Sequence, residues 1–336
     1  MKSHIETVHV ACDTCGADDT RLVATAIDHE YPDTTDDEFT FVQCTRCNLI
    51  YLNPRPAVSE LPTIYPPNYF AFDLADTGDA GSKLSVKGIS HHFEKRRFRK
   101  LLSQAAILDD GRTLSVFDVG CGDGFSLDLF RDVLGPDTLT AGVEMSDAAA
   151  LRASERGHNV VAGLFEETDL DNQTFDVIFS SHVIEHVASP SAFLDKIHNM
   201  LRPDGVVILD TPNVGSTQRK LFGRYWGGWH TPRHWNLYDD QTLTVLAQNR
   251  GFTVSRIMFM PINIFWIWGF HSALFARHRK LADALFDPAG ISKRGFTGVA
   301  LVGFFQVVEM AMKLVFPKTA QMRVIMHRSD TAKHGS

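Results

Sequence analysis

Two pairs of cysteines stand near the N-terminus, Cys12 with Cys15 and Cys44 with Cys47, and two residues separate the members of each pair. A Cys-x-x-Cys turn presents both sulfurs to one ion, and two such turns supply the four thiolates of a tetrahedral zinc site. Gly16 follows the first pair and suits the positive φ that such a turn needs. We predict one structural Zn²⁺ bound by these four cysteines; a redox-active dithiol is the alternative.

The segment between the two cysteine pairs is expected to form a long hairpin. From Asp13 to Glu38 it carries nine carboxylates and one arginine, and the whole chain of 336 residues has a formal net charge of −7. Such a surface would repel the phosphates of DNA or RNA. We therefore expect no nucleic acid as a partner.

A glycine-rich loop follows the apolar strand predicted from Leu114 to Val119. Its glycines, Gly120, Gly122 and Gly124, let the backbone pass close beneath a ligand, and the helix expected to follow offers free N–H groups. In dinucleotide-binding loops the third glycine lies one position later, where this chain has Phe125. The loop indicates a nucleotide-like cofactor, and its spacing differs from that of NAD-binding loops; the choice of cofactor depends on the combination of motifs.

The next predicted strand, Thr140 to Glu144, ends in a carboxylate 20 residues after Gly124. An acidic side chain at this place can accept hydrogen bonds from both hydroxyl groups of a ribose. Met145 follows and is placed to pack against an adenine. The alternative is that Glu144 only caps the helix predicted to begin at Ser146.

These motifs together resemble class I S-adenosylmethionine-dependent methyltransferases, in particular bacterial ones in which an Asn-Pro-Arg-Pro segment, here beginning at Asn53, follows an N-terminal zinc ribbon. The Phe-Asp, Ile-Glu-His and Leu-Arg-Pro-x-Gly landmarks of the superfamily follow at Phe175, Ile184 and Leu201. The resemblance implies S-adenosyl-L-methionine as the cofactor. It implies that the cofactor is bound by Asp118, Gly120, Cys121, Gly122, Gly124, Glu144, Met145, Phe165, Glu166, Ser181 and His182.

The alternation of strands and helices predicts a doubly wound, Rossmann-like α/β fold, and the resemblance implies a seven-stranded sheet. We expect a zinc ribbon and an extended leader over residues 1–70, in which prolines bar helix. Residues 71–112 should hold a flexible linker at Gly78 to Gly88 and a cofactor-covering helix at His91 to Leu102, with Phe93 and Phe98 among its apolar positions. Residues 113–336 should form the methyltransferase domain.

Four histidines are the candidates for a general base. His182 and His186 follow the fourth predicted strand and should open a helix, whereas His230 and His234 lie in an aromatic loop after the fifth. Methyl transfer requires alignment and removal of a proton from the acceptor, and histidine titrates near neutral pH. We prefer His230 or His186 as the base. Alternatively, His186 has a structural role or faces the cofactor, and His234 only forms hydrogen bonds within its loop. Arg233 is expected either to bind an anionic acceptor or to be exposed to solvent.

An apolar insertion, about residues 260–318, separates the sixth predicted strand from the seventh. Pro261 leaves fewer than 16 residues of the first apolar run for a helix, and the second run, Gly298 to Met312, is also short, so neither is expected to span a membrane. From Arg277 to Lys318 the chain has seven lysines and arginines against three carboxylates. This composition suits peripheral membrane contact, a hydrophobic acceptor or a homodimer interface; helices packed on the sheet are the alternative. At a membrane, contact is expected from Phe265, Trp266, Trp268 and Phe270, with Arg277, Arg279 and Lys280 beside anionic lipid.

The combined prediction is a methyltransferase that acts on a small-molecule acceptor, a nucleotide- or lipid-linked sugar or a secondary metabolite, as the resemblance implies. An O-methyltransferase of a quinone-like lipid is the alternative, because the Ile-Glu-His segment resembles ubiquinone-pathway enzymes. A non-catalytic, cofactor-binding scaffold is the alternative of another class. The polar residues from Met1 to Val10 lack the apolar core of a signal peptide, so a cytoplasmic location, extending to the inner face of the membrane, is expected.

Overall fold

The computed structural model describes residues 3–66, 69, 86–107, 112–170, 173–286 and 295–329. At its centre is a seven-stranded sheet with the order β12-β13-β10-β9-β6-β7-β8, in which β13 is antiparallel to both of its neighbours. The strands are β6 (Ser115–Val119), β7 (Leu139–Glu144), β8 (Asn159–Ala162), β9 (Phe175–Ser181), β10 (Leu201–Pro212), β12 (Phe252–Met260) and β13 (Gln321–Arg328). The predicted fold class is confirmed.

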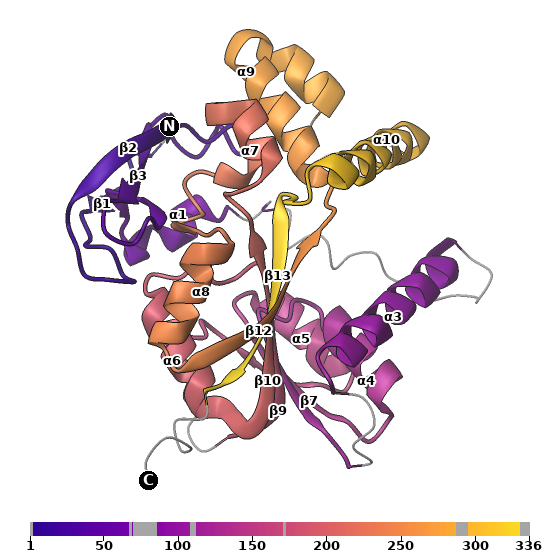
Figure 1. Ribbon diagram of the computed structural model, residues 1–336. Coiled ribbons are helices and arrows are strands. Elements are labelled where there is room, and N and C mark those ends of the chain that lie inside the picture. Colours follow the sequence, from indigo (N-terminus) through magenta and orange to yellow (C-terminus); the bar gives the residue numbers. More distant parts are fainter. Residues whose placement is uncertain are drawn as a thin grey trace.

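Helices cover both faces of this sheet, and side chains of the central strands alternate between them. Phe117 and Val207 join a core with α6 and α8, whereas Val116 and Ile208 join a second core with α3 and α4. Figure 1 shows α6 and α8 on the left and α3 and α4 on the right. The helices are α3 (Val86–Gln104), α4 (Phe125–Leu134), α5 (Asp147–Glu155), α6 (Pro190–Met200) and α8 (Asp240–Asn249).

The N-terminal segment forms its own small sheet, which the large domain completes. The predicted hairpin is present, because β2 pairs with β3 in antiparallel fashion. The short strand β11 (Asn236–Leu237) adds to the edge of β4, so residues 185 positions apart share this sheet. The N-terminal strands are β1 (Thr7–Val8), β2 (Thr20–Ala26), β3 (Phe39–Cys44), β4 (Ile50–Leu52) and β5 (Arg55–Pro56).

The leader and the linker differ in part from expectation. The leader contains a 3-10 turn, Val58–Glu60, and a short helix α1 (Leu61–Ile64), because Pro62 lies in the first turn, where its missing N–H is not needed. Helix α3 begins at Val86, earlier than predicted, and Phe93 is exposed rather than part of its apolar face. Residues 78–85 of the predicted linker lie outside the described residues.

The segment after β9 was expected to open a helix, and this prediction is wrong. His182 has a positive φ of 57°, and residues 182–188 form turns. Helix α6 begins only at Pro190, where the side chain of Ser189 caps it by accepting from the N–H of Ala192. Proline is suited to the first helical position, so the sequence places the helix start there.

The apolar insertion forms two helices at the carboxyl edge of the sheet, preceded by a short helix α7 (Thr217–Phe222). Helix α9 (Ile264–Phe286) breaks at His278, and its second half folds back on its first, since Phe270 and Phe286 stack with ring centroids 5.5 Å apart. Figure 1 shows this helical hairpin at the upper end of the molecule, next to α10 (Gly295–Val315).

The predicted shortness of the second apolar run is wrong. Among the described residues, the part of α10 from Thr297 to Val315 is long and apolar enough to cross a membrane, with a mean hydropathy of 1.7. The helix is longer than predicted because Lys313 does not end it: its ammonium group donates to the carbonyl of Phe259, 2.6 Å away.

Candidate active site

The glycine loop after β6 has the open, left-handed backbone that a close ligand requires. Gly120, Gly122 and Gly124 have φ values of 76°, 55° and 85°. A Cβ atom on Gly120 would lie 2.7 Å from the side chain of Val183, and one on Gly124 would lie 2.7 Å from His158. A Cβ atom on Gly122 would meet nothing within 4 Å, so this residue faces open space where a cofactor fits.

Glu144 braces this loop from the end of β7. One carboxylate oxygen accepts from the N–H of Gly122 at 2.9 Å and the other from the N–H of Ser146 at 2.8 Å. The side chain of Ser146, not Glu144, is the N-cap of α5. A carboxylate offers about four acceptor positions, so two backbone donors leave room for the two hydroxyl groups of a ribose.

Asp118 and Cys121 are buried beside the loop rather than lining open space. Burial, together with the charges of Glu144 and Asp210, holds the pKa of Asp118 well above its usual value. A neutral carboxyl group of this kind can donate a hydrogen bond. Burial also raises the pKa of the Cys121 thiol, so it is an unreactive core group.

The other predicted cofactor residues differ in how far they are exposed to solvent. Met145 is 37% exposed and Glu166 is exposed, whereas Ser181 is half-buried at the end of β9. Phe165 is 4% exposed, and its ring packs against Phe193 in the core, with centroids 5.2 Å apart. The ring of Phe165, expected to bind the cofactor, is therefore a core side chain in this structure.

The four histidines come together at the carboxyl edge. The ring of His234 lies 4.6 Å from that of His186 and 4.8 Å from that of His230, between centroids. His182 is hydrogen-bonded to Glu185 at 3.1 Å. Because Val183, the residue after His182, leaves no room for a Cβ atom on Gly120, the cluster lies next to the glycine loop.

A buried carboxylate anchors this cluster. Glu185 is fully buried, and its two oxygens contact Nδ1 of His182 and the hydroxyl of Thr211. Burial alone would raise the pKa of Glu185, but the hydrogen bond and charge of His182 outweigh it and lower the pKa. Burial alone would lower the pKa of His182. The hydrogen bond to Glu185 and the charge of Glu185 outweigh burial, so the pKa of His182 is raised.

His234 is held in one tautomer, whereas Nδ1 of His186 has two partners. Nδ1 of His234 lies 2.9 Å from the carbonyl oxygen of Gly228, which only accepts, so this Nδ1 carries the proton and Nε2 is an acceptor. Nδ1 of His186 lies 2.8 Å from the hydroxyl of Tyr65, which can donate or accept, and 3.1 Å from the carbonyl oxygen of Arg233. Burial lowers the pKa of His186 to about 4 and that of His234 well below its usual value, so both rings are neutral near pH 7.

His230 is held by residues from the N-terminal segment. Nδ1 of His230 lies 2.8 Å from a carboxyl oxygen of Glu30, and its Nε2 lies 3.1 Å from the hydroxyl of Tyr69. The ring also stacks on Trp268 of α9 at 5.3 Å. Burial, with the charge of Arg233, lowers the pKa of His230 to about 3, so this histidine too is neutral near pH 7.

Arg233 is neither exposed nor directed at an acceptor, contrary to both expectations. Its guanidinium is fully buried and donates to Asp28 at 2.7 Å, and it lies over the ring of Tyr31. The acidic arm was expected to be a surface segment, so the roles of Asp28, Glu30 and the leader tyrosines beside the histidines were not predicted. An aromatic residue within the arm, Tyr31, was the one signal of burial.

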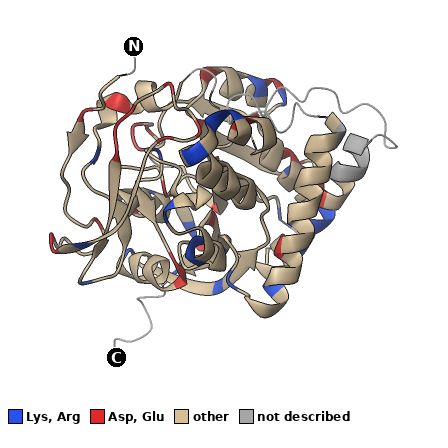
Figure 2. Cartoon of the chain, turned by 90° about the horizontal axis from the view of Figure 1, so that it is seen from above, with Lys and Arg blue, Asp and Glu red and all other residues tan. Residues whose placement is uncertain are grey.

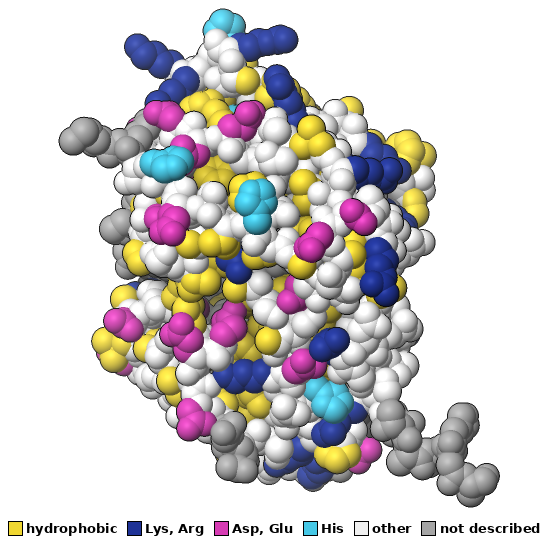
Figure 3. Space-filling view, turned by 90° about the vertical axis from the view of Figure 1, so that its left-hand side faces the viewer, with side chains coloured by type: hydrophobic (Ala, Val, Ile, Leu, Met, Phe, Trp, Pro, Cys, Tyr) yellow, Lys and Arg dark blue, Asp and Glu magenta, His cyan; other side chains and the backbone are white. Residues whose placement is uncertain are grey.

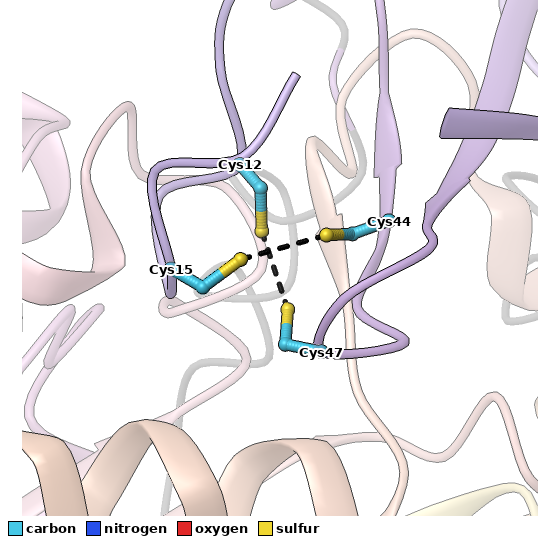
Figure 4. Close-up of side chains that lie close together, drawn as sticks. All are labelled: Cys12, Cys15, Cys44 and Cys47. Atoms are coloured by element: carbon cyan, nitrogen blue, oxygen red, sulfur yellow. Dashed lines mark hydrogen bonds between the residues drawn. The ribbon is translucent and has the colours of Figure 1, made fainter. Parts of the chain in front are cut away.

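The four cysteines fit a zinc ion. Their sulfurs all lie within 4.8 Å of one another, and the contacts of Cys12 with Cys47 and of Cys15 with Cys44 measure 3.4 and 3.5 Å (Figure 4). Tetrahedral Zn–S bonds of about 2.3 Å place sulfurs roughly 3.8 Å apart. Asp13, inside the first turn, accepts from the hydroxyl of Ser189 at 2.7 Å, so the cysteine site is attached to the start of α6.

Comparison with known proteins agrees with this geometry. A family model described as a methyltransferase domain matches residues 90–257. The solved structure of phosphoethanolamine N-methyltransferase 2 from Haemonchus contortus, in complex with S-adenosyl-L-methionine, matches with a TM-score of 0.51 at 15% identity, covering 93% of this chain and 69% of that chain. That likeness concerns the fold alone.

Curated relatives differ in what they act on. The mitochondrial ubiquinone biosynthesis O-methyltransferase of Mus musculus is 25% identical over 223 residues, which cover 59% of this chain and 60% of that protein. The tRNA U34 carboxymethyltransferase of Aeromonas salmonicida is 30% identical over 158 residues, 43% of this chain and 46% of that protein. The chain thus spans at most about three fifths of the length of these relatives.

Proposed function

This chain belongs to the methyltransferase-domain family, and on that premise we propose that it transfers a methyl group from S-adenosylmethionine to a small-molecule acceptor. The observation that carries the proposal is the closeness of Val183 to Gly120, where an added Cβ atom would lie 2.7 Å from the Val183 side chain, because it brings the glycine loop next to the histidine cluster. A bound cofactor and a proton acceptor would therefore lie side by side. S-adenosylmethionine, when bound, supplies an electrophilic methyl group; Glu144 and the N–H groups at the start of α4 would hold it.

His186 is the general base of the proposed reaction. Its ring is neutral near pH 7, so the ring nitrogen that carries no proton can take the proton of an acceptor hydroxyl. The proton taken up would leave a positive ring beside Glu185, whose lowered pKa keeps it ionised. Glu185 thus stabilises the charge that forms, and Arg233 positions His186 through its carbonyl group.

The acceptor that we propose is a sugar, nucleotide- or lipid-linked, or a secondary metabolite. A quinone-like lipid is the second candidate, and the names of the ubiquinone-pathway relatives favour it. We propose no nucleic acid as the acceptor. The arm between the cysteine pairs is acidic, and Figure 2 shows basic residues mixed with acidic ones rather than forming a basic patch.

The test is methyl transfer from labelled S-adenosylmethionine into separate pools of nucleotide sugars, lipid-linked sugars and hydroxyquinones. Labelled product from one pool, lost in His186→Ala and kept in the matched variant His92→Ala on the exposed side of α3, would support the proposal. Tight cofactor binding without labelling of any pool would indicate the non-catalytic scaffold instead.

We also propose that Cys12, Cys15, Cys44 and Cys47 bind a structural Zn²⁺. The sulfur separations support it, and so does the structural role of the site: it joins the two ends of the ribbon and, through Asp13, the start of α6. Four thiolates leave no open coordination position, so the metal would stabilise the fold and take no part in methyl transfer.

A further inference from the structure

Helix α10 is reversed with respect to an ordinary surface helix: its polar residues face the protein. Glu309 is 2% exposed, and one carboxylate oxygen accepts from Nε2 of Gln218 and from Nε1 of Trp266, both at 2.7 Å. Gln306, one turn earlier, contacts the side-chain amide of Asn263 at 3.1 Å. A helix on a water-facing surface normally places such groups outward and its apolar side inward.

The outward side of α10 is apolar along its length. The exposed side chains recur every three to five residues: Val299, Phe304, Val307, Met310 and Leu314, which are 56–88% exposed. These positions span about 23 Å of helix at 1.5 Å per residue. The charged residues of the helix are Glu309 and Lys313, and neither is exposed. The stripe therefore carries no charge.

A basic tip lies next to this stripe. Arg277, Arg279 and Lys280 are exposed around the break in α9 at His278; Arg279 also lies 3.7 Å from Asp33 and 3.9 Å from Asp283. Figure 3 shows lysine and arginine side chains gathered at the top of the molecule, the level that α9 occupies in Figure 1. The returning half of α9 lies against α10, because Phe286 is in ring contact with Phe305 at 6.5 Å.

The apolar part of this surface is small for a stable dimer interface, to which polar residues also contribute. Stable interfaces engage about 20–30 residues on each side. Among the described residues, nine exposed large apolar side chains lie on this surface: six on α10, Phe316 directly after it, and Leu281 and Leu285 on the returning half of α9. An uncharged apolar stripe flanked by cationic side chains is instead the pattern of helices that lie in the interface of an anionic bilayer.

We propose that the outer side of α10, together with the basic tip of α9, is a membrane-docking surface for a bilayer with anionic headgroups. The residues that enter the lipid are those of the α10 stripe. The earlier expectation is wrong for Phe265, Trp266 and Trp268, because these side chains are 2–7% exposed and pack inside the fold. Phe270, the fourth side chain expected at the membrane, is 38% exposed. This docking stands independently of the proposed methyl transfer.

The docking surface is connected to the histidine cluster through α9. Trp268 stacks on His230, while Trp266 on the same helix donates to Glu309 of α10. A bilayer bound along α10 would thus lie beside the carboxyl edge of the sheet. The acceptors best placed to reach the site would be molecules anchored in that bilayer.

The experiment is flotation of the full-length protein with vesicles of phosphatidylcholine containing 30% phosphatidylglycerol. We expect the wild-type protein to float and the double variant Val307→Glu/Leu314→Glu to bind at least tenfold less. The matched control, Leu139→Glu/Leu151→Glu, changes two leucines that are 64% and 61% exposed elsewhere, and should float like the wild type. Arg277→Gln/Lys280→Gln should float less than wild type on anionic vesicles and equally on neutral ones.

Two results would overturn the proposal. The first is a wild-type protein that stays with the soluble fraction on anionic vesicles, or a Val307→Glu/Leu314→Glu variant that floats as well as the wild type. The second is sedimentation equilibrium showing a wild-type dimer that the same variant dissociates, with no flotation of either, which would make a second copy the occupant. Circular dichroism of each variant would verify that it is folded.

Discussion

Glu144 has two tasks at the residue scale, since it braces the glycine loop through Gly122 and is the candidate to hold a ribose. The two tasks respond differently to substitution. Glutamine keeps the side-chain length and one accepting oxygen, whereas alanine removes both the brace and the acceptor. A comparison of the two variants therefore separates loop geometry from ligand contact.

We expect Glu144→Ala to weaken S-adenosylmethionine binding by about 1.5–3 kcal/mol, the cost of losing hydrogen bonds to a charged group. That corresponds to roughly 10- to 150-fold in Kd. Isothermal titration calorimetry measures it, with Glu155→Ala, an exposed carboxylate of α5, as the control. Equal affinity of the Glu144→Ala and wild-type proteins would remove this residue from the cofactor site.

His186 gives a prediction in pH. Burial lowers its pKa to about 4, so it is neutral, and able to act as a base, above that pH. The methyl-transfer rate should persist through pH 6 and be lost as pH falls toward 4, unlike a base with the usual histidine pKa near 6.5. His186→Ala should lower kcat by about 10²- to 10⁴-fold. A rate that already halves near pH 6.5 in the wild-type protein would argue for another base.

Elements predicted from local pattern were found close to their predicted places. The strand from Phe175 to Ser181 and the helix after the glycine loop follow from apolar periodicity, because each signal lies within the segment itself. The wrong predictions concern side chains whose burial depends on contacts with residues far away in the sequence. Asp28 and Arg233 are 205 positions apart, and the outward side of α10 depends on which residues Glu309 meets, so no local pattern carries that information.

The joint between the acidic arm and the aromatic loop is a second element to test. Asp28 and Arg233 are both fully buried and bonded at 2.7 Å. Removing one partner leaves an uncompensated buried charge, which typically costs about 3–5 kcal/mol. We expect Asp28→Ala to lower the free energy of unfolding by that amount in urea titrations. Asp33→Ala, on an exposed side chain of the same arm, should change it little; equal effects of the two would show that the buried pair contributes nothing particular.

The cysteine site should bind one zinc ion per chain. Metal analysis of the purified protein should give a ratio near one, falling toward zero in Cys44→Ser, with the ribbon becoming sensitive to protease, because metal binding and folding of such a site are coupled. Cys121→Ser should keep its zinc, since Cys121 lies in the glycine loop away from the tetrad. Full zinc content in Cys44→Ser would refute the four-thiolate site.

On the scale of the whole molecule, the ribbon is part of the site rather than an appendage. It supplies Glu30, which contacts His230, and Asp28, which pairs with Arg233 beside the cluster. The leader that follows it supplies Tyr65 to His186 and Tyr69 to His230. The glycine loop and Glu144, in contrast, rest on the central sheet and touch none of these residues in the contacts described above. We therefore expect acceptor chemistry to depend on the ribbon more than cofactor binding does.

We expect loss of zinc to affect methyl transfer more than cofactor binding. Cys44→Ser should retain S-adenosylmethionine affinity within about twofold, because one of the two cores of the sheet that carries the cofactor residues, the one with Val116 and Cys121, contains no ribbon residue. The same variant should lose methyl transfer by tenfold or more, because an unfolded arm no longer presents Glu30 to His230. Calorimetry with the cofactor and a labelled-methyl assay on the same preparation measure both quantities. A parallel fall of affinity and activity would indicate general unfolding, and unchanged activity in zinc-free protein would show that the ribbon does not hold the site.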